Sequence, residues 1–183
     1  EHTWALLLAL LRHIPAAFSH VQQGGWDRQL FRGHNLSGQK LGILGLGRVG
    51  KQVGNYALAF GCETGAYDPY LEQWPNPGII RFETATALLK WCTILCIHIP
   101  YDASNFGFLN RQLLTCLRKG ALIINTSRSG IWDEETVTDL LNSGHLAGVA
   151  TDVIDHEQNP ELRKKSGLIK YAKTHQNLLI TPH

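Results

Sequence analysis

Three glycines follow a short apolar run in the segment LGILGLGRVG, at positions 45, 47 and 50. In the pattern G-x-G-x-x-G, the first glycine permits a tight turn and the second lets the backbone approach a pyrophosphate. The third lets the next helix pack closely on the preceding strand, and the unpaired N–H groups of that helix attract an anion. Glycine-rich turns are common, so the pattern predicts a dinucleotide site only where a strand precedes it and a helix follows.

The residues around the glycines have the periodicity of a strand–helix–strand unit. Lys40–Leu44 is an apolar run typical of a strand, and Arg48–Phe60 has helical spacing of apolar residues. The face of this helix expected to be buried carries Val49, Val53, Tyr56, Ala57 and Phe60. Glu63–Tyr67 forms the next expected strand, and Asp68 follows it, 18 residues after Gly50. An acid near this distance binds a ribose, although Asp68 also suits a turn before a proline.

Apolar runs and helical patterns continue to alternate through the rest of the chain. Further strands are expected at residues 93–99, 121–127, 146–153 and 177–183. Helices ending in glycine are expected at 110–120 and, after the capping residue Asp133, at 134–144. Uniformly apolar strands separated by helices are typical of a parallel sheet covered on both faces. The sequence therefore predicts an α/β fold with a doubly wound parallel sheet of the Rossmann type.

Residues 1–26 precede this alternation and are expected to form two helices, the second beginning near Pro15. The first is apolar around much of its circumference, with helical spacing of Trp4, Leu7, Leu8 and Leu11. We expect this helix to be buried on several sides, and a second subunit is one candidate for covering it. We therefore predict a helical connecting and dimerisation segment at 1–26, a core at 40–183, and a homodimer.

Charge, hydropathy and cysteine usage exclude several other classes of protein. The net charge is +2, and the basic residues form no stripe of the kind that binds nucleic acids. The early apolar run WALLLALL is too short to cross a bilayer, so no membrane partner is expected. No C-x-x-C pair is present among the cysteines, which are Cys62, Cys92, Cys96 and Cys116. Their apolar surroundings indicate buried free thiols in a reducing, cytoplasmic environment, without a bound metal.

Polar residues follow several of the predicted strands, at the sheet edge where parallel α/β sheets bind ligands. Besides the glycine loop they are Asp68, His98, Thr126, Ser127, Arg128, Asp152 and His183. Each alone has a structural explanation: His98 suits a core histidine, Arg128 a surface residue and Asp152 a cap. Their common position at one edge of the sheet favours a binding site.

Several stretches together resemble the NAD-binding domain of the D-isomer-specific 2-hydroxyacid dehydrogenases, particularly phosphoglycerate dehydrogenase-like members. These stretches are LGILGLGRVG, AYDP, IHIP, LIINTSRSGIWDEETVTDLLNSGHLAGVATDV and NLLITPH. They occur in order across essentially the whole chain. The resemblance implies an NAD-dependent oxidoreductase that is dimeric through this domain. Its substrate would be a small 2-oxo acid or D-2-hydroxy acid, with 3-phosphoglycerate as one candidate.

The resemblance also assigns residues to the cofactor. The pyrophosphate loop would be Gly45, Gly47, Arg48, Val49 and Gly50, and the acid on the adenosine ribose would be Asp68. Further contacts along the cofactor would come from His98, Ile99, Pro100, Thr126, Ser127, Arg128 and Asp152. Because Asp68 would repel a 2′-phosphate and no arginine stands immediately beside it, we expect NAD rather than NADP.

Three residues match the catalytic group of this family: Arg128, Glu157 and His183. The arginine fork would bind the substrate carboxylate in a bidentate way and polarise the adjacent carbonyl. The histidine titrates near neutral pH and so suits proton exchange with the C2 oxygen during hydride transfer. A carboxylate beside its other ring nitrogen fixes the tautomer and favours the charged form.

The chain departs from the family pattern after the supporting acid. Gln158 stands where a proline is usual, and a long segment precedes the last strand, so His156 competes with Glu157 as the titratable neighbour of His183. The family's second, substrate-binding domain is absent from these residues, so we expect the isolated domain to bind NADH with little turnover. The alternative is an NAD-sensing or corepressor-like protein on the same fold, which needs the loop and Asp68 but not the catalytic trio.

Overall fold

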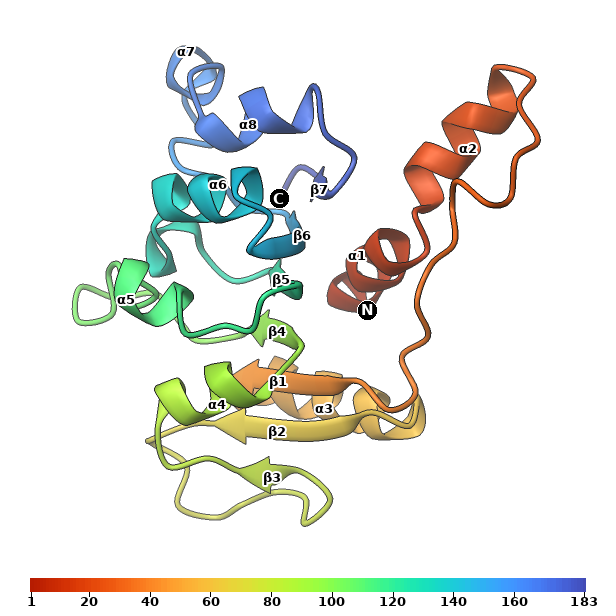
Figure 1. The fold of residues 1–183 in the computed structure, drawn as a ribbon. Coiled ribbons are helices and arrows are strands. Elements are labelled where there is room, and N and C mark those ends of the chain that lie inside the picture. Colours follow the sequence, from red (N-terminus) through yellow and green to blue (C-terminus); the bar gives the residue numbers. More distant parts are fainter.

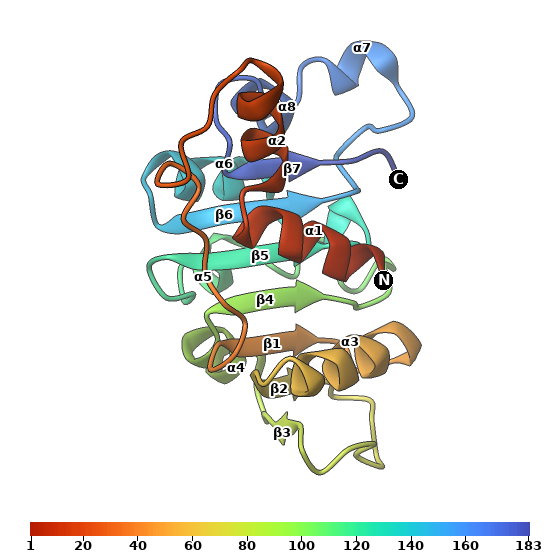
Figure 2. The same cartoon turned by 90° about the vertical axis from the view of Figure 1, so that its right-hand side faces the viewer.

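A computed structural model describes residues 1–183, and its centre is a sheet of seven parallel strands. The strands are β1 (Lys40–Leu44), β2 (Glu63–Tyr67), β3 (Ile80–Arg81), β4 (Ile94–Ile97), β5 (Ala121–Asn125), β6 (Leu146–Thr151) and β7 (Leu178–Ile180). Their order is β3-β2-β1-β4-β5-β6-β7, so the topology reverses between β1 and β4. Figure 1 shows this arrangement, and in Figure 2 the strand arrows point the same way. The predicted doubly wound sheet is confirmed.

Helices cover both faces of the sheet (Figure 1). One face carries α1 (His2–Leu11) and α3 (Arg48–Ala59), which contact β5–β7 and β1–β2 respectively. The other face carries α4 (Ala85–Trp91), α5 (Arg111–Leu114), α6 (Glu134–Asn142) and α8 (Gly167–Ala172). Two shorter pieces are α7 (Pro160–Arg163) and a 3₁₀ turn (Ser129–Ile131), and α2 (Ile14–Gln22) follows α1.

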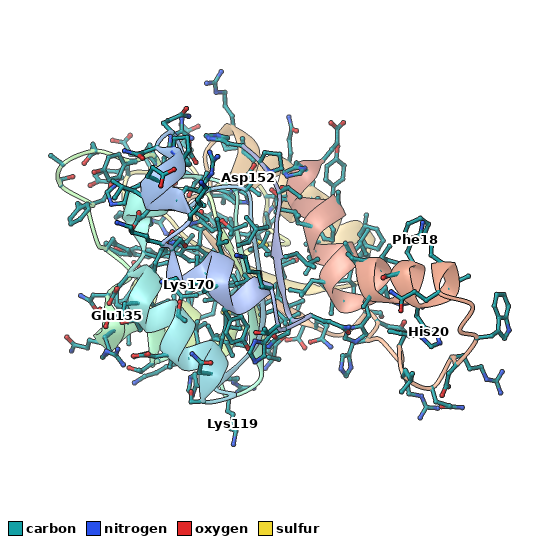
Figure 3. The ribbon with its side chains drawn as sticks, turned by 90° about the horizontal axis from the view of Figure 1, so that it is seen from above. Phe18, His20, Lys119, Glu135, Asp152 and Lys170 are labelled. Carbon is teal, nitrogen blue, oxygen red and sulfur yellow. The ribbon has the colours of Figure 1, made fainter.

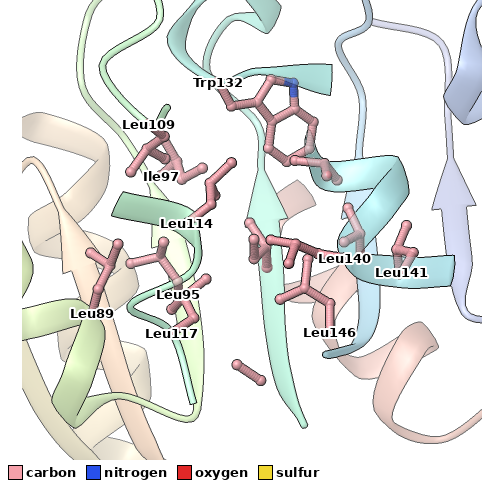
Figure 4. Packing of buried hydrophobic residues seen from close by; sticks show 14 of the residues in the cluster. Leu89, Leu95, Ile97, Leu109, Leu114, Leu117, Trp132, Leu140, Leu141 and Leu146 are labelled. Atoms are coloured by element: carbon pink, nitrogen blue, oxygen red, sulfur yellow. The ribbon is translucent and has the colours of Figure 1, made fainter. Parts of the chain in front are cut away.

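Each face of the sheet has its own apolar core. The larger cluster lies under α4, α6 and α8, and the smaller lies under α1 and α3. Figure 4 shows part of the larger cluster. Within it, Leu95, Leu114 and Leu117 lie to one flank of β5, and Leu140 and Leu146 lie to the other flank. Burial of such aliphatic side chains is the main favourable term in folding, about 1.5–3 kcal/mol for each. These cores hold the strands in register and so position the loops at their carboxyl ends.

Side-chain caps start most of the helices on the larger cluster. The caps are Thr84 for α4, Asn110 for α5, Asp133 for α6 and Ser166 for α8, each accepting a hydrogen bond from a backbone N–H two or three residues later. Such caps satisfy N–H groups that have no partner inside the helix. Only the cap at Asp133 was predicted from the sequence.

The strand–helix–strand unit around the glycines matches its predicted bounds, with α3 ending one residue before Phe60. All four later strands are shorter than predicted, because β4, β5, β6 and β7 end at Ile97, Asn125, Thr151 and Ile180. The helix predicted at 110–120 is only the single turn α5, and β3, α4, α7 and α8 were not predicted. These missed elements have two to seven residues, too few for a clear periodicity.

The opening helix α1 is buried on several sides, as predicted, but this chain alone covers it. Trp4, Leu7 and Leu11 are among its buried residues, and it packs against β5, β6 and β7. Leu8 of this helix is only partly buried, and whether a second subunit covers the segment stays a prediction. The exposed apolar surface lies on α2, which has no buried residue and extends away from the sheet, with Phe18 and His20 on it (Figure 3). The division at residues 26 and 40 stays a prediction.

The predicted inner face of α3 is only partly buried. Val53 and Ala57 face the core, whereas Val49, Tyr56 and Phe60 are between 43% and 56% exposed. The predicted burial of these three side chains is wrong, since they lie at the margin of the helix–sheet contact. Two of them contact α1, because the Trp4 ring stacks on Phe60 at 5.0 Å and meets Tyr56 edge-on.

Three of the four cysteines are buried as predicted, and all four are free thiols. Burial raises the pKa of Cys92 to about 12, so this thiol stays protonated. Cys116 is only half-buried and donates to the Gln112 carbonyl, which corrects the expectation that it is fully buried. No single helix is long and apolar enough to cross a membrane.

Candidate functional site

The predicted site residues lie along one edge of the sheet, because all seven strands end there. Both chain ends also lie at this edge (Figure 2). The loops after β1, β2, β4, β5 and β6 and the residues after β7 therefore border one another, in the order of the strands. The start of α1 joins them from the opposite end of the sequence.

A different structural feature explains the presence of glycine at each of the three positions after β1. Gly45 has a φ of +91°, and a Cβ atom there would lie 2.8 Å from the His98 carbonyl oxygen. A Cβ atom on Gly50 would collide with the carbonyl oxygen of Gly45, so only glycine permits this close packing. At Gly47 a Cβ atom would meet nothing within 4 Å, so open space lies beside the start of α3. This open space beside unpaired N–H groups suits a pyrophosphate.

The two remaining loop residues, Arg48 and Val49, begin α3 and are exposed at this edge. The first turn of α3 carries no acidic side chain that would compete with an anionic ligand. Asp68 follows β2 and accepts hydrogen bonds from the Leu46 N–H at 2.8 Å and from the Tyr70 N–H at 3.0 Å. These bonds join the loop after β2 to the glycine loop.

His98, Ile99 and Pro100 follow β4 directly, next to the glycine loop. The Nε2 atom of His98 is shielded from solvent and has no hydrogen-bond partner. Burial lowers the pKa of His98 to about 4, so its ring is neutral near pH 7. A neutral ring with a free nitrogen is suited to a polar ligand group rather than to a charged one.

A buried asparagine that sequence reasoning missed shapes the turn after β5. Asn125 is fully buried, and its Oδ1 atom accepts hydrogen bonds from both the N–H and the hydroxyl of Ser127, at 3.0 and 2.8 Å. Its Nδ2 atom donates to the Arg128 carbonyl. Thr126 bonds through its hydroxyl to Thr3 of α1 at 2.8 Å. An asparagine closing an apolar strand, directly before Thr and Ser, is the sequence signal that could have predicted this turn.

Arg128 lies at the end of this turn with its side chain exposed. One guanidinium nitrogen, Nη1, donates to the Ser127 carbonyl at 2.7 Å, which orients the group. The rest of its N–H fork has no partner in the protein and can receive a carboxylate.

The structure brings Glu157 and His183 together. The Nδ1 atom of His183 lies 3.0 Å from Oε1 of Glu157, and the two side chains are 43% and 29% exposed. His156, the competing candidate, has a φ of +57° and makes no side-chain contact with His183. The carboxylate accepts from Nδ1 and so favours the tautomer in which Nδ1 carries the proton, which leaves Nε2 available for proton exchange.

Asp152 follows β6 and lies near two histidines from opposite ends of the chain, one of which it contacts. Its Oδ2 atom lies 3.7 Å from Nε2 of His2, whose same nitrogen lies 3.0 Å from the Thr181 hydroxyl oxygen. The Oδ1 atom is shielded from solvent without a partner. Burial raises the pKa of Asp152 above its usual range, and the nearby His2 and His183 oppose that shift. His2 was not predicted, because no local pattern links it to β6.

A cavity of about 460 Å³ lies beside the Glu157–His183 pair, and it is lined in part by Asp152, Arg163 and Thr181. No group of three or more His, Cys, Asp or Glu side chains has the arrangement of a metal site. The site therefore combines an open phosphate cradle, unpartnered buried polar atoms at His98 and Asp152, and a histidine–carboxylate pair. These features fit a dinucleotide beside a small acid.

Comparison with known proteins identifies one family. Residues 4–183 match the model for the "D-isomer specific 2-hydroxyacid dehydrogenase, NAD binding domain". The chain is 35% identical to D-3-phosphoglycerate dehydrogenase of Bacillus subtilis over 184 residues, covering all of this chain and 34% of that protein. It is 31% identical to hydroxypyruvate reductase of Thermotoga maritima, covering 58% of that protein.

The fold of the chain also matches solved structures of related enzymes. The chain aligns over its whole length with 57% of D-2-hydroxyisocaproate dehydrogenase, with a TM-score of 0.89 and 26% identity. It spans about a third of the length of the D-3-phosphoglycerate dehydrogenases it matches. These matches confirm the resemblance inferred from the motifs, and they do not favour a sensing or corepressor-like protein.

Proposed function

Because the chain belongs to the D-isomer-specific 2-hydroxyacid dehydrogenase family, as its NAD-binding domain, we propose that its protein interconverts a 2-oxo acid and a D-2-hydroxy acid. Bound NAD(H) would supply or accept the hydride at the substrate C2. The residues of this chain would bind the cofactor, orient the substrate and exchange one proton. The observation that carries the proposal is the Glu157–His183 pair beside the cavity.

His183 is the proposed acid–base group. In the direction of reduction, its imidazolium would give the Nε2 proton to the C2 oxygen as the hydride arrives at C2. The Glu157 carboxylate, bonded to Nδ1, would stabilise the charged ring before that step and hold it in position. In the direction of oxidation the neutral ring would accept the proton from the hydroxyl group.

Arg128 is the proposed binding group for the substrate carboxylate. Its fork is oriented by the Ser127 carbonyl and is otherwise free. Two parallel N–H···O bonds would fix the plane of the carboxylate and polarise the neighbouring carbonyl group. A lysine ammonium is a point charge and could not bind the carboxylate in this bidentate way. Asp152, with one unpartnered oxygen, would bind a donor group on the nicotinamide side of the cofactor.

NAD is proposed rather than NADP. Asp68 carries a negative charge at the end of β2, where a 2′-phosphate on the adenosine ribose would be repelled. The residues immediately after Asp68 are Pro69 and Tyr70, neither of which is cationic. Ribose hydroxyls would instead donate to the Asp68 carboxylate.

The test of the proposed function is a substrate panel with the full-length protein. NADH oxidation would be followed by absorbance with 2-oxo acids of different size and charge, including hydroxypyruvate, and NAD reduction with 3-phosphoglycerate. We expect sustained turnover with at least one member and D stereochemistry in the product. Absence of turnover with every member, in a protein that binds NADH, would contradict the proposal. The 183-residue chain alone is expected to bind NADH with little turnover, because Arg128 and His183 are exposed to water.

A homodimer is the proposed assembly, and α2 is its proposed contact. Ile14, Phe18 and Val21 are 49–64% exposed on this helix, and Trp26 is 89% exposed just after it. Large apolar side chains gathered on one projecting element are typical of a protein interface. We further propose a cytoplasmic location without nucleic-acid or membrane partners, since the cysteines are free and the net charge is only +2.

A further inference from the structure

The segment that carries Glu157 forms a short closed turn rather than an extended loop. The Asn159 N–H donates to the His156 carbonyl at 2.9 Å, and the Arg163 N–H donates to the Asn159 carbonyl at 2.8 Å. The Asn159 side chain caps the single-turn helix α7 by accepting from Glu161 and Leu162. These bonds bring residue 163 back beside residue 157.

Within this turn, the guanidinium of Arg163 bonds to the residue that supports the acid–base group. Its Nη1 atom donates to the Glu157 backbone carbonyl at 2.7 Å. The Glu157 side chain in turn accepts from His183 at 3.0 Å. Glu157 is thus held by Arg163 through its main-chain carbonyl, while its carboxylate contacts His183.

Apolar packing restrains this turn only weakly. His156, Gln158 and the residues of α7 are exposed, so they bury little apolar surface that would fix the backbone. His156 adopts a left-handed conformation with φ +57°, which is unfavourable for a non-glycine residue. Gln158 has no ring to restrict φ as a proline would. The Arg163 side chain is therefore the group that ties the Glu157 main-chain carbonyl to the rest of the turn.

We propose that Arg163 is a positioning residue, whose bond to the Glu157 carbonyl holds the Glu157 carboxylate against Nδ1 of His183. The proposal rests on the proposed acid–base role of His183. It predicts that loss of the Arg163 guanidinium releases the turn, so the carboxylate leaves the histidine for part of the time. It assigns Arg163 no contact with substrate or cofactor.

Four charged or titratable groups surround His183 and decide how its pKa responds. Glu157 contacts His183 directly, Arg163 and Asp152 line the same cavity, and His2 at the start of α1 contacts Asp152. Loss of a carboxylate contact disfavours the charged ring and lowers its pKa, whereas loss of a nearby cation alone raises it. If removing Arg163 releases the Glu157 carboxylate, the pKa of His183 should therefore fall. If it only removes a nearby positive charge, that pKa should rise.

The first experiment measures the titration of His183 by NMR in the 183-residue chain, with the signal assigned by its absence in His183→Asn. We expect Glu157→Gln to lower the pKa of His183, and Arg163→Gln to lower it by about half a unit because these side chains are partly exposed. Arg163→Lys, which keeps a donor and a charge, should recover most of the original pKa. The control is Lys164→Gln, since Lys164 contacts only Glu161. An unchanged or raised pKa in Arg163→Gln would overturn the proposal.

The second experiment is a kinetic double-mutant cycle in the full-length protein. Arg163→Gln should lower kcat several-fold with little change in KM, and should have no further effect when Glu157 is already Gln. A raised KM with unchanged kcat, or an equal loss in the Glu157→Gln background, would mean that Arg163 acts on the substrate and would overturn the positioning role. Full turnover in His183→Asn would instead refute the proposed function, whereas the NMR titration tests the positioning of Glu157 independently.

Discussion

The Nδ1 atom of His183 lies 3.0 Å from a carboxylate oxygen of Glu157, although 26 residues separate the two in the chain. They meet because β6 and β7 are neighbouring parallel strands that end at the same edge of the sheet. Glu157 lies in the connection that leaves β6, and His183 follows β7 after three residues. Parallel pairing therefore places a histidine and a carboxylate from separate connections side by side.

The first prediction concerns this pair. His183→Asn in the full-length protein should lower kcat/KM by about 10²–10⁴-fold, because no other group can exchange the proton. Glu157→Gln should cost less, about 10- to 100-fold, and should move the histidine branch of the pH–rate profile to lower pH. NADH affinity should be unchanged in both variants, as fluorescence titration would show. Near-normal turnover in His183→Asn would refute the mechanism.

The second prediction concerns substrate binding by Arg128. Arg128→Lys keeps the positive charge but loses the planar fork, so kcat/KM should fall roughly 10²-fold while cofactor affinity is retained. The matched control is Arg118→Lys, since Arg118 donates to the Lys90 carbonyl before β5 begins, at the opposite edge of the sheet. Steady-state kinetics of the two variants would separate the roles, and equal losses in both would argue against a specific role for Arg128.

The third prediction concerns cofactor choice. Asp68→Asn keeps an acceptor for the Leu46 N–H but removes the charge facing the ribose. The affinity for NADPH relative to NADH should therefore rise about tenfold. Fluorescence titration with both cofactors measures this ratio, and Glu63→Gln, at the opposite end of β2, serves as the control. If the unaltered chain bound NADPH as tightly as NADH, Asp68 would not be the selecting residue.

The fourth prediction concerns a buried carboxyl on α6. Burial raises the pKa of Glu134 to about 7, although its carboxylate accepts a hydrogen bond from the Asp155 N–H. Between the unfolded pKa of 4.5 and the folded value, the folded chain binds more protons, so its stability falls as the pH rises. Glu134→Gln should match the unaltered chain at pH 5 and exceed it at pH 8 by about 1 kcal/mol in urea unfolding. The control is Glu135→Gln at an exposed neighbouring position: this variant keeps Glu134, so it should retain the pH dependence of the unaltered chain.

The fifth prediction concerns assembly. The unaltered chain should sediment as a dimer at about 20 μM, and Phe18→Asp should sediment as a monomer, because the charge would be buried in the proposed α2 interface. Phe106→Asp is the matched control, since Phe106 is similarly exposed (71% against 64%) but lies in the loop after β4. A dimer in Phe18→Asp would place the interface elsewhere, and a monomeric unaltered chain would refute the assembly.

The sequence by itself determined the elements that depend on neighbouring residues. The apolar run of β1, the glycine loop and the helical periodicity of α3 follow one another within 20 residues, so their structure was predicted with nearly correct bounds. The cap at Asp133 was also predictable, since a cap acts on the turn that follows it. The motifs, read in order, were enough to identify the family and its cofactor.

Only the tertiary structure decided which distant residues meet. The contacts of His2 with Asp152, of Thr3 with Thr126 and of His183 with Glu157 depend on how strands and helices pack. The same holds for burial, because α1 is covered by its own sheet while α2, which also carries large apolar side chains, is left exposed. Sequence patterns record the preferences of each segment, whereas these contacts depend on strand order and on the closing of long loops.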